Sequence, residues 1–413
     1  MNSFISIKDI SLPYIFLCLY IFFMYNSYLD VFPSVMHSLI LLGMIGFVLL
    51  GSFIKQNIYL SIFTLWYLLF CFTGVCSVTF YVHSDIVNVY RLIVTFIITL
   101  CFILEINSRK KLEGIANVYV FSSIVMALLI WLSGALDFLR YQEMTEDMRL
   151  GGDITGNANS FSTLFMFAGV FSAWLFIFEK KKWTKVLYLI CFLSILVIMA
   201  LSGGRKTMFS VFMAFSVFLL MKEDKNRKKV LKNICLLIIL AVLLIYILLE
   251  VPFFYNLIGE RFIGLFDLFT GQHNVEAHGD DMRKRIFSLA LNGWLENPIF
   301  GHGFDSFKFY NLRVTGHNYY AHNNYVELLY DLGLVGFLLY YYIYIYIYCN
   351  LRKLTSIDYK FKILGYGLLI ELLIFDFGGV SYYATENIVI LALAYVCSVK
   401  DKSLFFTGGI QIR

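Results

Sequence analysis

The sequence predicts an all-α, polytopic integral membrane protein with about twelve transmembrane helices and one long outer loop between the ninth and the tenth. Hydrophobic residues make up 60% of the 413 residues and charged residues 15%, whereas a soluble domain is close to half apolar and a quarter charged. The four prolines leave no room for proline-rich linkers. A chain this apolar suits a lipid bilayer, in which helices satisfy their own backbone hydrogen bonds.

Runs of roughly 20 mostly apolar residues, the length that crosses a bilayer, define the spans in order along the chain. They lie at 11–29, 35–54, 59–82, 86–106, 115–136, 158–178, 184–202, 207–221, 231–256, 323–349, 361–380 and 384–399. The first is expected to remain as a helix, because no small-x-small cleavage site follows it. The run YYYIYIYIY at 340–348 alternates like a strand, but it lies inside an apolar span, so we expect helix. Residues 1–413 are expected to form a single membrane domain.

The basic residues predict the orientation of these spans. Of the 33 Lys and Arg, 22 fall in the termini and in every second loop, with clusters at 109–111, 180–182, 222–232 and 352–362. Loops rich in Lys and Arg face the cytoplasm, so both termini are expected inside. Alternation then places about 138–157, the turn at 202–206 and the long loop at 257–322 on the outer side.

Several classes of protein are disfavoured. The net charge of +5 is modest, and its basic residues sit in short loops, so no nucleic-acid partner is expected. All eight cysteines lie within or beside predicted spans, which leaves neither a disulfide framework nor a Cys/His metal cluster. No nucleotide-binding glycine loop or G-x-S-x-G elbow is present. No internal repeat relates the two halves, which disfavours a transporter.

The long outer loop concentrates histidine. Five of the seven histidines lie in it or at its end, namely His273, His278, His302, His317 and His322. Histidine is the usual general base near neutral pH, and arginine offers a planar fork of donors that suits phosphate oxygens. Their combination predicts chemistry on a phosphate leaving group, without a metal.

Two motifs carry a resemblance to a known family. His322 and Asn323 are followed by nine residues, Gly333, two residues and Gly336, and the stretch RKRIFSLALNGWLENPIFGHGF (283–304) closes with N-P-x-x-G-x-G. Together they resemble the signature of the bacterial O-antigen polymerase and O-antigen ligase family. SGGRKT (202–207) and RLGGDITGNAN (149–159) resemble two further motifs of that family more weakly. The first 140 residues match nothing beyond hydropathy.

The resemblance implies a GT-C-like fold and a set of roles. His322 would be the catalytic base that deprotonates an acceptor sugar hydroxyl. Arg283 would hold the diphosphate of an undecaprenyl-linked donor, followed by Arg205 and then Arg149. No metal and no other cofactor is expected. The remaining expected substrate contacts are Asn323, Arg285, Arg261, His302 and His317, of which Arg261 and Arg285 match no motif position clearly.

These assignments have structural alternatives. His322 could anchor a helix end at the interface, and Asn323 could be a helix N-cap. Gly333 and Gly336 could serve only close helix packing. Glu327 and Asp331 lie four residues apart and share a helix face. Glu327 is expected either to act catalytically by orienting the site around His322, or to join Asp331 in an ion pair with Arg91.

The sequence therefore predicts a glycosyltransferase that polymerises undecaprenyl-diphosphate-linked oligosaccharide repeat units into O-antigen or capsular polysaccharide. It would lie in the bacterial inner membrane, with its active site on the periplasmic side. The alternatives are an O-antigen ligase that transfers the glycan to the lipid A core, a lipid-linked oligosaccharide flippase, and a non-catalytic scaffold. Expected partners are the lipid-linked oligosaccharide, membrane lipids, a chain-length regulator and a repeat-unit flippase.

Overall fold

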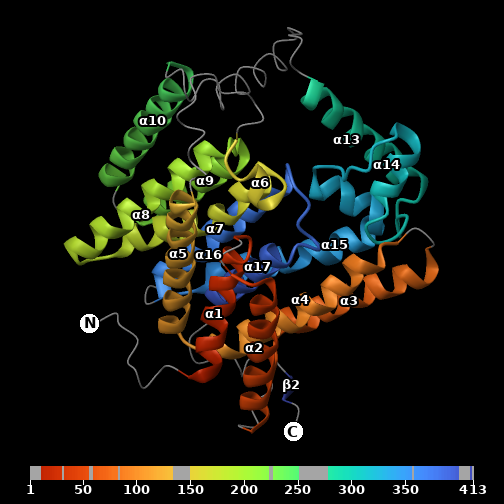
Figure 1. The fold of residues 1–413 in the computed structure, drawn as a ribbon, viewed down its shortest axis with the longest axis horizontal. Helices are drawn as coiled ribbons and strands as arrows, with labels where there is room; N and C mark the ends of the chain where they lie inside the picture. The colour runs from red at the N-terminus through yellow and green to blue at the C-terminus, as the bar shows by residue number, and fades with distance from the viewer. Residues whose placement is uncertain are drawn as a thin grey trace. The chain divides into compact units, whose positions relative to one another are not determined.

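The computed structural model describes residues 11–29, 32–54, 59–81, 84–133, 149–222, 227–250, 278–355, 358–399 and 410–411. This part of the chain holds fifteen helices (Figure 1). It also holds one short antiparallel pair of strands, β1 (Tyr59–Leu60) with β2 (Ile410–Gln411). The all-α prediction is confirmed.

Each of the twelve predicted spans coincides with a helix. These helices are α1 (Leu12–Asn26), α2 (Ser34–Ile54), α3 (Ile62–Phe80), α4 (Ile86–Glu105), α5 (Arg109–Leu132), α7 (Ala158–Phe178), α8 (Lys182–Leu201), α9 (Arg205–Lys222), α10 (Arg227–Glu250), α15 (Asn324–Lys353), α16 (Tyr359–Asp376) and α17 (Thr385–Ser398). The alternating run at 340–348 lies within α15, so helix was the correct prediction.

Seven of these helices are long and apolar enough to cross a membrane: α2, α3, α4, α5, α7, α8 and α15. Helices α1 and α17 are apolar but shorter, with 15 and 14 residues. The chain is thus a polytopic membrane protein. Crossing by all twelve helices, and the side on which each loop lies, stay predictions.

Polar side chains at the helix starts determine where several helices begin. Ser61 caps α3, Asp85 caps α4 and Asn157 caps α7, each by accepting a backbone N–H with its side-chain oxygen. An N-cap satisfies donors that have no partner inside the helix, which matters most where water is scarce.

The chain divides into two compact units, each made of segments far apart in sequence. Unit 1 comprises Met1–Met44 and Lys110–Val275, and unit 2 comprises Ile45–Arg109 and Glu276–Arg413. In unit 1, α7 is buried along most of its length and packs against α8 and α9. Helices α1 and α5 are joined there by a hydrogen bond from the Tyr14 hydroxyl to the Lys111 carbonyl (3.0 Å).

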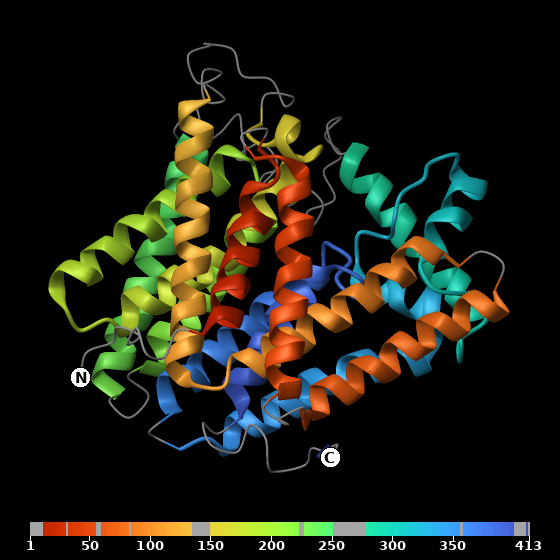
Figure 2. The ribbon, with the colours of Figure 1, turned by 60° about the horizontal axis from the view of Figure 1, so that its bottom comes forward.

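Unit 2 packs α15 against α3, α16 and α17, and α17 against α4. Figure 2 shows α3 and α4 running side by side in this unit. The Trp66 indole N–H on α3 donates to the Leu339 carbonyl on α15 (2.6 Å), and Phe70 and Tyr340 pack ring to ring between the same helices. These contacts form the core beneath the candidate site.

The segment expected as a long outer loop contains two helices. Residues 257–277 lie outside the described residues, but α13 (His278–Glu296) and α14 (Phe307–Thr315) occupy much of the remainder. Both pack on the first turns of α15, through a cluster of buried side chains. That cluster comprises Ile286, Ala290, Phe307, Ala321, Val326 and Tyr330. The segment is therefore attached to the start of α15 by an apolar core of its own.

Candidate active site

Helix α15 is interrupted at Gly333, where the backbone has φ 63° and ψ −166°. The chain from 298 to 303 fills the interruption with four backbone hydrogen bonds. They run from Leu334 N to Pro298 O (2.9 Å), Val335 N to Ile299 O (3.1 Å), His302 N to Tyr330 O (2.9 Å) and Gly303 N to Asp331 O (2.8 Å). We call this arrangement of 298–303 against 330–335 the backbone clamp.

The clamp requires glycine at two positions. A Cβ on Gly301 would lie 2.5 Å from the Asp331 carbonyl carbon, and a Cβ on Gly333 would overlap the Ile299 carbonyl. Both residues also have positive φ, which glycine adopts without strain. The N-P-x-x-G-x-G and H-N-x9-G-x-x-G motifs therefore touch each other directly. Gly333 does more than permit helices to pack closely, because it creates the break that the other motif fills.

His302 lies inside the clamp. Its Nε2–H donates to the Gly293 carbonyl (2.8 Å), its Nδ1 lies 3.4 Å from the Asn297 amide nitrogen, and its ring stacks on Tyr330 at 4.5 Å. Both ring nitrogens are thus engaged within the protein, in a geometry suited to joining α13 to α15.

His322 immediately precedes α15 and has a left-handed backbone, with φ 55°. The next residue, Asn323, is the helix N-cap and accepts the Val326 N–H with its side-chain oxygen (3.1 Å). Glu327 reaches back to accept the Ala321 N–H (2.6 Å). The backbone around His322 is therefore held on both sides. Positive φ costs a non-glycine residue of the order of 1 kcal/mol or more, so such a conformation needs this support.

Two tyrosine rings, Tyr319 and Tyr320, lie beside the His322 ring. The Tyr320 ring lies 4.2 Å from the His322 ring. Burial and the Glu327 charge raise the pKa of Tyr320, and the Arg283 charge opposes them. Arg283, exposed on α13, is thus close enough to act on the same tyrosine that contacts His322. The residues that the sequence assigned as base and as diphosphate ligand thus both lie in unit 2, and their roles stay predictions.

Two other expected contacts are exposed in the same unit. The His317 ring stacks on Tyr319 at 5.5 Å, in the loop that leads to His322. Arg285 is exposed on α13, two residues after Arg283. Positions two apart on a helix point in different directions, so these two arginines do not share a face.

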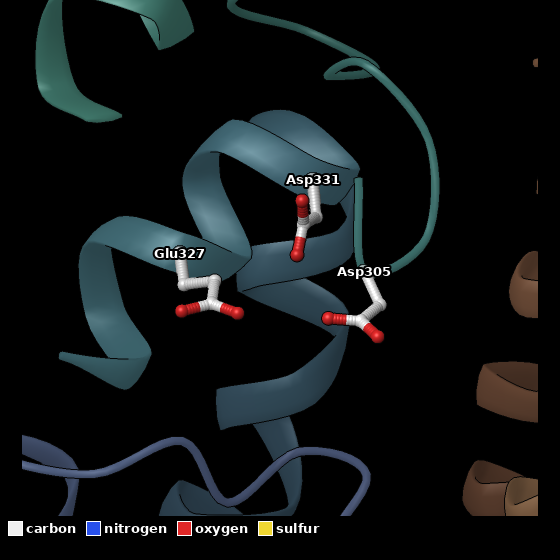
Figure 3. A group of neighbouring side chains, drawn as sticks. All are labelled: Asp305, Glu327 and Asp331. Atoms are coloured by element: carbon white, nitrogen blue, oxygen red, sulfur yellow. The ribbon is translucent and has the colours of Figure 1, made fainter. Parts of the chain in front are cut away.

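Three carboxylates gather beside the first turns of α15. Asp305, Glu327 and Asp331 are each 0% exposed, and one oxygen from each lies within 4.8 Å of the others (Figure 3). Their cation is Lys308, which binds Asp305 Oδ2 (2.6 Å) and also Asp85. Arg91 is exposed on α4, and the hydrogen bonds of Glu327 and Asp331 come from backbone, hydroxyl and phenol donors. Glu327 and Asp331 were expected to form an ion pair with Arg91, but these hydrogen bonds take its place.

The pKa shifts around Lys308 follow from burial and pairing. Burial raises the pKa of Asp305, although Lys308 and the Asn88 amide lower it. Burial would lower the pKa of Lys308, but its two carboxylate partners outweigh that effect and raise it. Burial would raise the pKa of Asp85, but Lys308 and the Val87 N–H lower it overall. Lys308 thus stays charged while it bridges two segments, at 85 and 305.

In unit 1, each of the two weaker motifs contacts a residue close in sequence to the other. Leu150 N donates to the Leu201 carbonyl (3.1 Å), and the Ser162 and Thr207 hydroxyls lie 2.5 Å apart. Arg149 follows the undescribed segment 134–148 and Arg205 begins α9; both are half-buried. Arg261 lies outside the described residues.

The sequence did not identify Asp305 or Lys308 as part of the site. Asp305 lies two residues after the last glycine of the N-P-x-x-G-x-G motif, and that position is the one signal that could have marked it. Its approach to Asp331, 26 residues later in the chain, depends on the clamp.

Comparison with known families reports similarity over nearly half of the chain. Residues 152–341 match the family model described as O-antigen ligase. The matched region contains 202–207, 283–304 and 322–336, and it begins after Arg149. No curated protein matches the chain.

Proposed function

Because residues 152–341 match the family model described as O-antigen ligase, we propose that this membrane protein belongs to that family and is a glycosyltransferase acting on undecaprenyl-diphosphate-linked oligosaccharide. It would join lipid-linked repeat units into O-antigen or capsular polysaccharide. The observation that carries this proposal is the setting of His322. Asn323 and Glu327 hold the backbone on either side of it. The Tyr320 ring contacts the His322 ring, and the Arg283 charge lowers the pKa of the same tyrosine.

The proposed reaction is a displacement at the anomeric carbon of the donor sugar. His322 accepts the proton of the acceptor hydroxyl, and the acceptor oxygen forms a bond to the anomeric carbon. The bond from that carbon to the diphosphate oxygen breaks, and its electron pair leaves with undecaprenyl diphosphate. Arg283 stabilises the charge that grows on the diphosphate, and no metal takes part in this step. A positioned base contributes roughly 10²–10⁴-fold, and a donor aimed at developing charge about 10²–10³-fold.

Glu327 is proposed as a positioning residue. Its Oε2 accepts the N–H of Ala321, the residue directly before His322, so it acts on the base through the backbone. Because the Glu327 side chain is 0% exposed, the proposal gives it no contact with the sugar. The strained backbone at His322 supports this role.

Polymerase is preferred to ligase because of the aromatic residues beside His322. Tyr319 and Tyr320 are 48% and 38% exposed, and amphipathic aromatic rings offer flat faces and a hydroxyl to sugars. A polymerase holds sugars on both the donor and the acceptor side. The ligase alternative shares the same base and diphosphate ligand and differs in its acceptor, the lipid A core.

The His322→Ala variant tests the assignment of the base. We expect transfer of lipid-linked glycan to fall about 10²–10⁴-fold, while the amount of folded protein in the membrane is retained. His37→Ala is the matched control, since His37 lies on α2, where its ring stacks on Tyr20 at 5.5 Å. Near-normal polysaccharide synthesis by His322→Ala would return this residue to the role of a helix anchor.

Deleting the gene separates polymerase from ligase. Loss of a polymerase leaves single repeat units on the lipid A core, or their capsular equivalent. Loss of a ligase leaves long chains on undecaprenyl diphosphate and a bare core. The second outcome would refute the polymerase assignment, but it would leave the proposed transfer of glycan from undecaprenyl diphosphate in place.

The proposed location is the bacterial inner membrane, with both termini cytoplasmic and 257–322 periplasmic. Cysteine variants at Asn226 and Asn274, made in a cysteine-free background, test this orientation. A membrane-impermeant thiol reagent added from outside should label position 274 and leave 226 unlabelled. The reverse pattern would invert the topology and remove the periplasmic site. A chain-length regulator and a repeat-unit flippase are the proposed protein partners.

A further inference from the structure

Three buried carboxylates near the start of α15 have a single cation among their contacts in the described part of the chain. Asp305, Glu327 and Asp331 are 0% exposed, and among the described residues Lys308 pairs with one of them, Asp305. Lys308 also binds Asp85. Glu327 and Asp331 accept hydrogen bonds but have no salt bridge of their own among the described residues. Burying an uncompensated carboxylate is costly, so such groups are usually paired or coordinate a metal.

The hydrogen bonds of the three carboxylates leave specific oxygens without a donor. Asp331 is well satisfied: Oδ1 accepts from the Ser306 and Phe307 N–H groups and the Ser306 hydroxyl, and Oδ2 accepts from the Tyr382 hydroxyl (2.6 Å). Glu327 Oε1 and Asp305 Oδ1, in contrast, are buried without any hydrogen-bond partner. These two atoms are an observation separate from the proximity of the acids, because each is a buried acceptor that no donor among the described residues reaches.

Figure 3 shows that the three carboxylates point toward one another rather than into separate surroundings. One oxygen from each lies within 4.8 Å of the others. A Ca²⁺ ion binds oxygen at about 2.3–2.6 Å, so two ligands on opposite sides of it lie roughly 4.6–5.2 Å apart. A single ion can thus touch all three side chains with little movement. Glu327 Oε1 and Asp305 Oδ1 have no donor among the described residues that would compete for their lone pairs.

We propose that this cluster binds one divalent cation that prefers oxygen ligands. Ca²⁺ is the expected ion, and Mg²⁺, which is smaller, is the alternative. Asp305, Glu327 and Asp331 are its ligands. The cation neutralises the excess charge and ties the chain at 305 to the first turns of α15. Through the bond from Ala321 N to Glu327 it supports the backbone of His322. The cation is surrounded by buried side chains. It takes no part in the transfer step, which His322 and Arg283 carry out as proposed above.

The full-length protein, purified in detergent, provides the test. After treatment with EDTA and desalting, the protein is mixed with CaCl₂ or MgCl₂, and its bound metal and thermal unfolding midpoint are measured. We expect one ion per chain and a midpoint raised by about 3 °C or more at saturating ion. Neither readout depends on catalysis, so a failed cation proposal and a failed glycosyltransferase proposal remain distinguishable.

Isosteric variants locate the site. Asp305→Asn and Glu327→Gln remove charge with little change in shape, and each should abolish both the bound ion and the shift in midpoint. Glu371→Gln is the matched control: Glu371 is also 0% exposed with both oxygens unpartnered, but it lies on α16, outside the cluster. It should keep the ion. Wild-type protein that binds no ion and shows no shift would overturn the proposal, as would an unchanged shift in the Asp305→Asn, Glu327→Gln double variant.

Discussion

Substituting Gly333 by alanine tests whether the backbone clamp builds the site. The backbone at Gly333, with φ 63° and ψ −166°, lies in a region that is accessible essentially to glycine alone. An added Cβ would also overlap the Ile299 carbonyl. That carbonyl accepts the Val335 N–H, and the neighbouring Pro298 carbonyl accepts the Leu334 N–H. Relief of the overlap must therefore separate these two hydrogen-bonded pairs.

The expected loss combines strain with lost hydrogen bonds. Forcing alanine into this conformation costs about 1–3 kcal/mol, and each hydrogen bond contributes about 0.5–1.5 kcal/mol net. With two bonds lost, the free energy of unfolding should fall by about 2–6 kcal/mol. Displacement of 298–303 also moves Asp305 away from Asp331, so transfer activity should fall as well.

Thermal unfolding of the purified protein and glycan transfer in membranes measure the two effects. Gly46→Ala provides the control, because Gly46 lies in helix α2 and a Cβ there meets no atom within 4 Å. This control should be neutral or stabilise the protein by up to about 1 kcal/mol. If Gly333→Ala matches Gly46→Ala in both stability and activity, the clamp does not hold the site, and our account of the paired motifs is wrong.

Three further substitutions follow from the site. Arg283→Ala should lower transfer about 10²-fold, and Arg283→Lys should restore it only in part. Arg313→Ala, on α14, is the control, and an equal loss of transfer in Arg313→Ala and Arg283→Ala would refute the diphosphate role. Lys308→Met leaves Asp85 and Asp305 unpaired and should destabilise the protein by about 3–5 kcal/mol; an unchanged unfolding midpoint would contradict the pairing. Asn323→Ala should cost about 1 kcal/mol and Asn323→Ser almost nothing; unequal transfer at equal stability would indicate a direct role in catalysis.

The helices were predictable because hydropathy is a local property. Each long apolar run must satisfy its own backbone groups in lipid, and helix is the structure that does so within one segment. For that reason even the alternating run at 340–348 is helical. Helices α13 and α14 escaped prediction because they are short or polar, and their apolar contacts are made with α15 rather than with lipid.

The site was predictable only in part. His322 and Arg283 stand in recognisable motifs, and the structure brings both near Tyr320. Asp305 and Lys308 stand in no motif that marks them. Their roles arise because the clamp carries 303–308 to the side of α15, where Asp305 approaches Asp331 and Lys308 reaches Asp85.

What the sequence determined by itself was the class of protein, the position of its apolar helices and the residues His322 and Arg283 as candidates. Those features depend on composition, on runs of neighbouring residues and on motif spacing. The tertiary structure alone decided that α15 breaks at Gly333 and that three carboxylates converge beside its first turns. Both features depend on close approach between segments distant in the chain. The N-cap of Asn323 is a local contact with Val326, and the sequence already offered it as one role of that residue. Hydropathy and spacing do not encode contacts between distant segments, because they arise only when the segments pack.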